Sequence, residues 1–166
     1  MKIAIIGFGY IGSVIGGVLS SRGHNVLAID NEQKRINELN EGGCSIPEPL
    51  LKEMIRDAVS NSLLKGSTEY DLVYENDVIL VTVGTSLSDE YDADLSALRS
   101  VFQNLSSKVV SGQIIMVKST VPPGVTRLLA SEYFSNRDDI YIGFSPERLA
   151  EGNAINELNE LPIIVG

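Results

Sequence analysis

Three glycines and an aspartate near the N-terminus have the types and the spacing needed to hold a phosphorylated ligand. In "GFGYIG", Gly7, Gly9 and Gly12 follow the pattern G-x-G-x-x-G, and Asp30 ends the next apolar run, "HNVLAID". Glycines permit a tight turn and a close approach of phosphate oxygens, and the free amides at a helix start attract anions. An acid placed one strand later can accept hydrogen bonds from a ribose hydroxyl. Together these residues predict a dinucleotide site.

Each residue of the glycine loop has an expected role. Gly7 permits the turn from strand to helix, Gly9 leaves room for a pyrophosphate, and Gly12 lets the helix pack closely against the strand. The amides of Tyr10, Ile11 and Gly12 are then expected to face the phosphates at the positive end of the helix dipole.

The acid at position 30 bears on which dinucleotide is bound. A carboxylate accepts a hydrogen bond from a ribose 2′-hydroxyl and repels a 2′-phosphate, so Asp30 favours NAD over NADP. Arg35 follows closely and is a cation of the kind that serves NADP, which argues in the opposite direction. The expected cofactor is NAD, with Arg35 at the same end of the site, and no metal site is expected.

A second polar cluster ends a buried strand in "VKSTVPPGVT", residues 117–126. Ser119 and Thr120 supply hydroxyls, and the two prolines that follow fix φ and lack an amide donor, so the strand stops there. Other apolar runs end in Gly84-Thr85 and in Ser145-Pro146-Glu147. Since ligands bind beyond the carboxyl ends of strands in an open α/β sheet, these groups are expected to converge on the crevice that holds the dinucleotide.

The elements that must position these residues alternate along the chain. Helical patterns cover 10–22, 31–40, 50–59, 95–108 and 124–134, and strand patterns cover 2–7, 24–30, 77–83, 113–119, 140–145 and 161–166. Strands separated by helices predict a doubly wound, mostly parallel sheet with right-handed crossovers. The expected fold class is therefore α/β, of the Rossmann type that binds NAD.

Composition excludes several classes of partner. The chain has 166 residues, 43% of them hydrophobic, which suits a single domain with one sizeable core. A formal net charge of −9 argues against nucleic acid and against an anionic membrane surface. No apolar run approaches the ~20 residues of a membrane span. The single cysteine excludes an internal disulfide and suits a reducing compartment, so a cytoplasmic protein is expected.

Three motifs together resemble the UDP-glucose/GDP-mannose dehydrogenase family, the nucleotide-sugar 6-dehydrogenases. They are "GFGYIG" with its following Asp30, "KSTVPPGVT" and "SPERLAEG", and the loop "GGCSIPEPLL" is similar to a further segment of that family. The resemblance covers essentially the whole chain. "SPER" is most similar to members that act on UDP-N-acetylhexosamines, such as UDP-N-acetylmannosamine, which serve polysaccharide biosynthesis.

The resemblance implies two successive NAD-dependent oxidations of a sugar C6 alcohol to a carboxylate. In the family a cysteine traps the aldehyde as a thiohemiacetal, and water then releases the acid. Thr120 matches the family threonine and Glu147 the family glutamate, which implies catalytic roles: Thr120 holds the water or the nicotinamide, and Glu147 acts as the base. The expected cofactor-binding residues are Gly7, Gly9, Tyr10, Ile11, Gly12, Asp30, Arg35, Gly84, Thr85, Ser119, Thr120 and Glu147.

The resemblance also implies regions that this chain does not contain. The family's catalytic cysteine, lysine and asparagine belong to a central dimerisation domain and a C-terminal domain that binds the UDP-sugar. Cys44 lies in the wrong place to be that nucleophile. Residues 1–166 are thus expected to be the NAD-binding domain of a longer enzyme, inactive alone, whose full-length form is a homodimer.

Two alternatives stay open on the sequence. The first is a stand-alone NAD-binding or redox-sensing module that has no catalytic activity. The second is a dehydrogenase domain of the 6-phosphogluconate or 3-hydroxyacyl-CoA type. "KSTVPPG" and "SPERLAEG" speak against the last of these.

Overall fold

Six parallel strands form one sheet in the order β3-β2-β1-β4-β5-β6 in the computed structural model, which describes residues 1–86 and 93–166. The strands are β1 (Lys2–Ile6), β2 (Asn25–Ile29), β3 (Leu64–Ser67), β4 (Val78–Val81), β5 (Ile114–Val117) and β6 (Tyr141–Phe144). This arrangement confirms the predicted doubly wound α/β fold.

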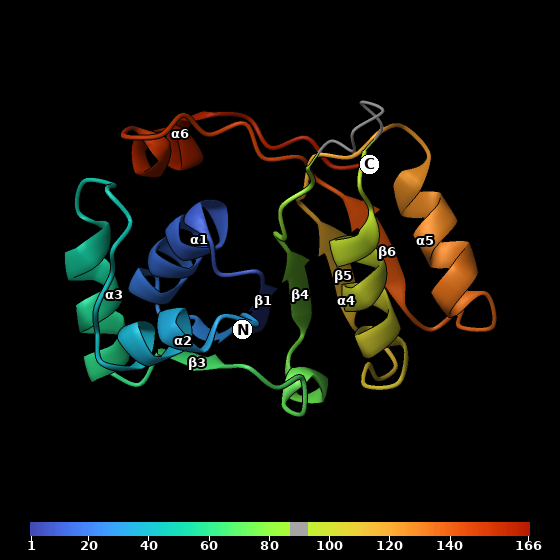
Figure 1. Ribbon diagram of the computed structural model, residues 1–166, viewed down its shortest axis with the longest axis horizontal. Coiled ribbons are helices and arrows are strands. Elements are labelled where there is room, and N and C mark those ends of the chain that lie inside the picture. The colour runs from blue at the N-terminus through green and yellow to red at the C-terminus, as the bar shows by residue number, and fades with distance from the viewer. Residues whose placement is uncertain (87–92) are drawn as a thin grey trace.

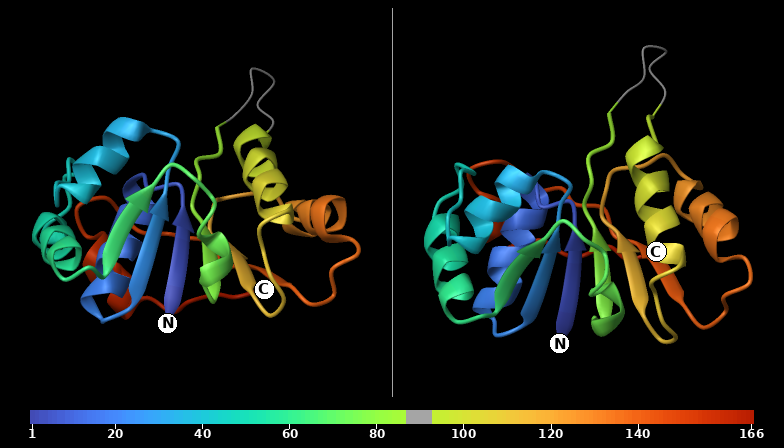
Figure 2. Two further views of the ribbon diagram at one scale, coloured as in Figure 1. Left: turned by 90° about the horizontal axis from the view of Figure 1, so that it is seen from below. Right: turned by 60° about the horizontal axis from the view of Figure 1, so that its bottom comes forward.

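Helices cover both faces of the sheet (Figures 1 and 2). They are α1 (Tyr10–Ser21), α2 (Gln33–Asn40), α3 (Leu51–Ser60), α4 (Ser96–Ser106), α5 (Val125–Phe134) and α6 (Ala154–Glu160), with a short 3₁₀ turn, η1 (Val73–Glu75), before β4. One face carries α4 and α5, and the other carries the group formed by α1, α2, α3 and α6.

Alternation along the strands produces these two layers. In β1, Ala4 and Ile6 pack into the core under α4 and α5, whereas Ile3 and Ile5 pack into the core under α1 and α3. Successive side chains of a strand point to opposite faces, so an unbroken apolar run fills both cores.

The strand order reverses direction between β1 and β4. β1 pairs with β2 on one side and with β4 on the other. Helix α1, which follows β1, and helix α4, which follows β4, lie on opposite faces of the sheet. Such a switch point leaves a crevice outside the carboxyl ends of the strands, because the two connections leave in opposite directions. The glycine loop lies at this crevice.

Three local expectations fail. β3 was not predicted, because "LKGS" is short and has one lysine and one glycine in place of an apolar run. Helix α6 was also not predicted. The predicted strand over 161–166 is wrong as a regular strand: in this segment Gly166 and Phe144 exchange two backbone hydrogen bonds of 2.7 and 2.9 Å.

Within the parts of the chain that the structure describes, no helix has the length and apolar character needed to cross a membrane.

Candidate functional site

The glycine loop makes the turn that its sequence predicts. Gly7 has φ +91°, a left-handed conformation that a side chain disfavours. A Cβ on Gly12 would lie 2.2 Å from the carbonyl oxygen of Gly7, so α1 can pack here only without a side chain. A Cβ on Gly9 would meet nothing within 4 Å. The backbone at Gly9 therefore faces open space, where a ligand can approach it.

The amides of Tyr10, Ile11 and Gly12 form the first turn of α1. The first four amides of a helix have no carbonyl partner within the helix. Here the backbone bond nearest the helix start runs from the amide of Ser13 to the carbonyl of Gly9, at 2.9 Å. The three preceding amides are thus available to an anion at the positive end of the helix dipole.

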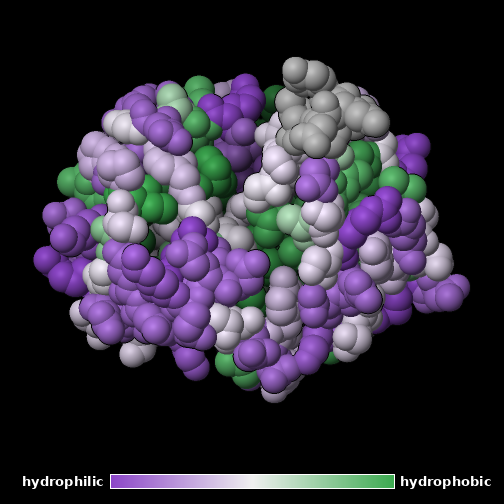
Figure 3. Space-filling model, viewed as in Figure 1, coloured by the Kyte–Doolittle hydropathy of each residue, from purple (hydrophilic) through white to green (hydrophobic). Residues whose placement is uncertain are grey.

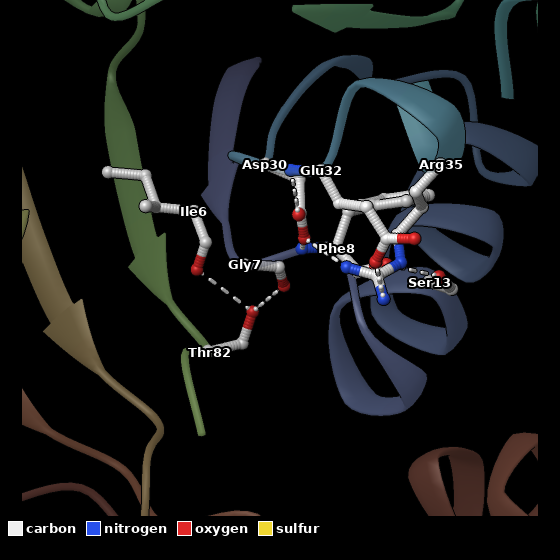
Figure 4. A network of polar contacts seen from close by, with 8 residues as sticks. All are labelled: Ile6, Gly7, Phe8, Ser13, Asp30, Glu32, Arg35 and Thr82. Atoms are coloured by element: carbon white, nitrogen blue, oxygen red, sulfur yellow. Dashed lines mark hydrogen bonds and ion pairs between the residues drawn. The ribbon is translucent and has the colours of Figure 1, made fainter. Parts of the chain in front are cut away.

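Thr82, at the end of β4, holds the glycine loop in place and was not predicted from the sequence. Its hydroxyl donates to the carbonyl oxygen of Gly7 at 2.6 Å and lies 3.2 Å from that of Ile6 (Figure 4). This contact joins the carboxyl ends of the two strands that flank the crevice. Only the pairing of β1 with β4 reveals it, because the two residues are far apart in the sequence.

Asp30 is bound directly to the glycine loop. Its carboxylate accepts hydrogen bonds from the amide of Phe8 at 2.7 Å and from that of Glu32 at 2.9 Å (Figure 4). The side chain of Arg35 donates to it at 2.9 Å, and Asp30 is only 6% exposed. These donors fix the carboxylate and leave acceptor capacity on its second oxygen, Oδ1.

Arg35 is shared between two acids. Its guanidinium contacts Asp30 and also Glu32, the latter at 2.6 Å. One positive charge is therefore balanced by two negative charges at this end of the crevice. A 2′-phosphate would meet net negative charge here, and a 2′-hydroxyl would not be repelled.

A pocket of about 420 Å³ opens beside these residues, with the glycine loop and Arg35 of α2 on one side and α4 on the other. Among the predicted cofactor residues, those that line it are Gly7, Gly9, Asp30, Arg35 and Gly84. In the face shown in Figure 3 the surface is hollowed between the two helix groups, with hydrophilic residues on the left of the hollow and hydrophobic ones on its right. The pocket has an acid at one end and bare backbone beside it, which fits the adenosine half of a dinucleotide.

The far wall of this pocket was not predicted. It comes from the segment after β3 and from α4, and its residues are Thr68, Tyr70, Ala97, Ser100, Val101 and Asn104. Burial, together with the negative charge of Asp30, raises the pKa of Tyr70 to about 12. Tyr70 offers a neutral aromatic ring near the acid.

The predicted residues that follow β4, β5 and β6 beyond Gly84 lie at the neighbouring strand ends and do not line that pocket; they are Thr85, Ser119, Thr120 and Glu147. The hydroxyl of Thr85 donates to the carbonyl of Thr120 at 2.7 Å, and the hydroxyl of Ser119 donates to that of Val83 at 2.6 Å. These bonds tie the corner after β5 to the segment after β4. Thr120 itself is exposed.

A buried ion pair joins the ends of β5 and β6. The ammonium of Lys118 lies 3.1 Å from the carboxylate of Glu147, and the two side chains are 11% and 12% exposed. The ammonium also donates to the carbonyl of Ser145 at 3.1 Å. The structure thus brings Thr120 and Glu147 to adjacent strand ends, since Lys118 is two positions before Thr120.

Cys44 lies in a different part of the molecule, in the loop between α2 and α3. It packs against the core under α1 and α3. Burial raises the pKa of its thiol, which disfavours the thiolate form that a nucleophile needs.

Comparison with known proteins gives a consistent set of relatives. A sequence model of the NAD-binding domain of the UDP-glucose/GDP-mannose dehydrogenase family matches residues 1–166. The GDP-mannose 6-dehydrogenase of Pseudomonas putida is 29% identical over 175 residues, covering 99% of this chain and 40% of that protein. A UDP-N-acetyl-D-mannosamine dehydrogenase of Methanococcus maripaludis is 31% identical, covering 99% of this chain and 38% of that protein.

Solved structures agree. The structure of UDP-D-ManNAc dehydrogenase from Pyrococcus horikoshii superposes with a TM-score of 0.94 at 29% identity, covering all of this chain and 41% of that one. The chain therefore spans about 40% of the length of the relatives that it resembles.

Proposed function

Since the chain belongs to the UDP-glucose/GDP-mannose dehydrogenase family, as its NAD-binding domain, we propose that it supplies the NAD site of a nucleotide-sugar 6-dehydrogenase. The complete enzyme oxidises the C6 alcohol of a UDP-sugar to a carboxylate with two NAD. The proposed substrate class is the UDP-N-acetylhexosamines, with UDP-N-acetylmannosamine first, because of "SPER" and the relatives named above. We further propose a cytoplasmic enzyme whose complete form is a homodimer.

The observation that carries this proposal is the bond between the Asp30 carboxylate and the amide of Phe8, inside the glycine loop. It places the acid beside the bare backbone of Gly9, on the rim of one pocket. In the proposed complex Asp30 and Arg35 hold the adenosine ribose. The amides of Tyr10, Ile11 and Gly12 hold the pyrophosphate.

At the other end of the cofactor we propose that the corner after β5 and the end of β6 serve the chemistry. NAD, when bound, supplies the acceptor for the hydride. Gly84, Thr85 and Ser119 then lie along the nicotinamide half, Thr120 holds the hydrolytic water or the nicotinamide, and Glu147 accepts a proton from that water. The ion pair with Lys118 supports this role, because the contact at 3.1 Å fixes the direction of the carboxylate.

NAD is expected to bind this chain at least tenfold more tightly than NADP. The reason is the two carboxylates, of Asp30 and Glu32, that surround the one guanidinium of Arg35. Titration calorimetry with each dinucleotide measures the ratio.

Asp30→Asn is the matched variant, since it keeps the size of the side chain and removes one negative charge. The variant should bring the affinities for NAD and NADP closer together, mainly because it binds NAD more weakly. Equal affinities of the unmodified chain for NAD and NADP would refute the role of Asp30.

The 166-residue chain by itself is expected to reduce no NAD in the presence of UDP-N-acetylmannosamine, UDP-glucose or GDP-mannose. The family resemblance implies a cysteine nucleophile, and Cys44 packs against a core away from the strand ends. Absorbance at 340 nm, the band of reduced nicotinamide, follows the reaction. Turnover that survives Cys44→Ser would show that this chain carries the complete chemistry by another route.

A further inference from the structure

Glu48 is a buried acid that neither the sequence analysis nor the proposed function uses. It lies in the loop between α2 and α3 and is only 7% exposed. Its carboxylate accepts hydrogen bonds from the hydroxyl of Tyr10, from the amide of Gly152 at 2.8 Å and from the amide of Ile155 at 3.3 Å. A carboxylate held by uncharged donors is an unusual way to fill a core, because burying a charge is costly.

The network is built to keep Glu48 ionised. Burial alone raises the pKa of its carboxyl, but hydrogen bonds from Tyr10 and from the amides of Ile155, Gly152 and Ala154 outweigh burial and lower that pKa. Burial raises the pKa of Tyr10 to about 12, helped by its bond to Glu48. At neutral pH, Tyr10 is therefore the donor and Glu48 the charged acceptor.

The partners of Glu48 come from distant parts of the chain. Tyr10 is the first residue of α1 and part of the glycine loop. Gly152 and Ile155 follow the segment that leaves β6 and crosses to the side of α1 (Figure 1). The amide of Gly152 also donates to the hydroxyl of Tyr10 at 3.1 Å. One carboxylate thus joins the glycine loop to the segment that begins at Glu147.

Packing alone already anchors this segment. Ala154 and Ile155 are buried in the core under α1 and α3, so α6 is held there by apolar contacts. An apolar residue at position 48 would be sufficient for that purpose and would avoid the cost of a buried charge. The carboxylate has a further effect: by accepting the hydrogen bond from Tyr10 it fixes the orientation of that side chain, and with it the first turn of α1.

We propose that Glu48 is a positioning residue for NAD binding, which acts through Tyr10 and couples the glycine loop to residues 147–155. The inference rests on the proposed function, since it assigns the pyrophosphate to the first turn of α1. A ligand that fixes this turn should also order the segment beyond Glu147, and the reverse must hold to the same extent.

The test uses Tyr10→Phe, Glu48→Gln and the double variant, with Glu53→Gln as control. Glu53 is an exposed acid in the first turn of α3. Affinity for NAD is measured by calorimetry at a temperature where each variant is fully folded. Each single variant is expected to raise the dissociation constant about tenfold, a usual size for the coupling between a positioning contact and a binding site. The double variant should be no worse than either single one, and Glu53→Gln should match the wild type.

A second readout separates positioning from general stability. In the wild type, NAD should slow hydrogen exchange at the amides of Gly152 and Ile155, although the proposed site does not contact them. In Tyr10→Phe this slowing should disappear while the protein stays folded. If Glu48→Gln does not fold, Tyr10→Phe alone carries the test.

The outcomes are distinct. A wild type that binds NAD, with Tyr10→Phe binding it equally well and showing the same slowed exchange, would overturn the inference and leave the proposed function intact. A wild type that does not bind NAD would overturn both.

Discussion

Gly9→Ala is expected to raise the dissociation constant for NAD about a hundredfold and to leave the stability of the fold unchanged. The space around a Cβ at this position is empty to 4 Å, so the protein itself does not resist the methyl group. A bound pyrophosphate would resist it, because phosphate oxygens must approach the backbone here to reach the amides of α1. Two lost hydrogen bonds to a charged group, each at the lower end of the usual range, about 1.5 kcal/mol, account for an effect of this size. Calorimetry with NAD and urea unfolding measure the two quantities.

Gly12→Ala is the control within the same motif, and its expected result is the reverse. Its Cβ would lie 2.2 Å from the carbonyl oxygen of Gly7 and 2.9 Å from the hydroxyl of Thr82. The start of α1 must then move away from β1, which disturbs the core before any ligand binds, so the midpoint of urea unfolding should fall sharply. If Gly9→Ala also loses stability, or keeps full affinity for NAD, the roles assigned to these two glycines are wrong.

The sheet was predictable wherever one strand carries enough signal by itself. β1, β2 and β4 are β-branched, apolar runs buried on both faces, and each precedes a helical pattern. β3 is an edge strand that pairs with β2 on one side only. Its sequence, "LKGS", has too few apolar residues to predict a strand, and the pairing with β2 is what holds it in the sheet. Residues 154–160 form α6 because Ile155 and Ala154 find a core built by α1 and α3. No local pattern reveals such a core.

In the candidate site, too, some residues were predictable from the sequence and others were not. Residues at strand ends were predictable, since the carboxyl ends of parallel strands meet at one edge of the sheet. Asp30 and the glycine loop are joined for this reason. The contacts of Thr82 with Gly7 and of Glu48 with Tyr10 depend on which strands are neighbours and on how a loop folds back. Those are properties of the tertiary structure, and a threonine or a glutamate alone does not signal them.

The pocket beside Asp30 lies at the switch point, whereas the predicted catalytic residues follow β5 and β6 and do not line it. The pocket beside Asp30 ends at Gly84, and the corner after β5 begins with the contact between Thr85 and Thr120. An extended dinucleotide can bridge the two, because the end of β4 contributes consecutive residues to both.

Lys118→Met is expected to destabilise the chain by about 3–5 kcal/mol, the usual cost of removing one partner of a buried ion pair. Lys118 and Glu147 are 11% and 12% exposed, so the carboxylate left behind would be neither paired nor well solvated. Urea unfolding at pH 7 measures the loss. The matched control is Arg56→Met, because Arg56 pairs with Asp57 at 3.1 Å on the surface, with both side chains more than half exposed. That change should stay within about 0.5 kcal/mol.

The double variant Lys118→Met/Glu147→Leu shows whether the pair serves stability or orientation. It replaces both charges by apolar groups of similar size, so most of the lost stability should return, as it does for many buried pairs. A stable double variant would mean that the fold does not require the pair, and that its charges are kept for the direction they give to Glu147. If Lys118→Met is as stable as the wild type at pH 7, the carboxylate is not held by this lysine, and its proposed role as an oriented base loses its support.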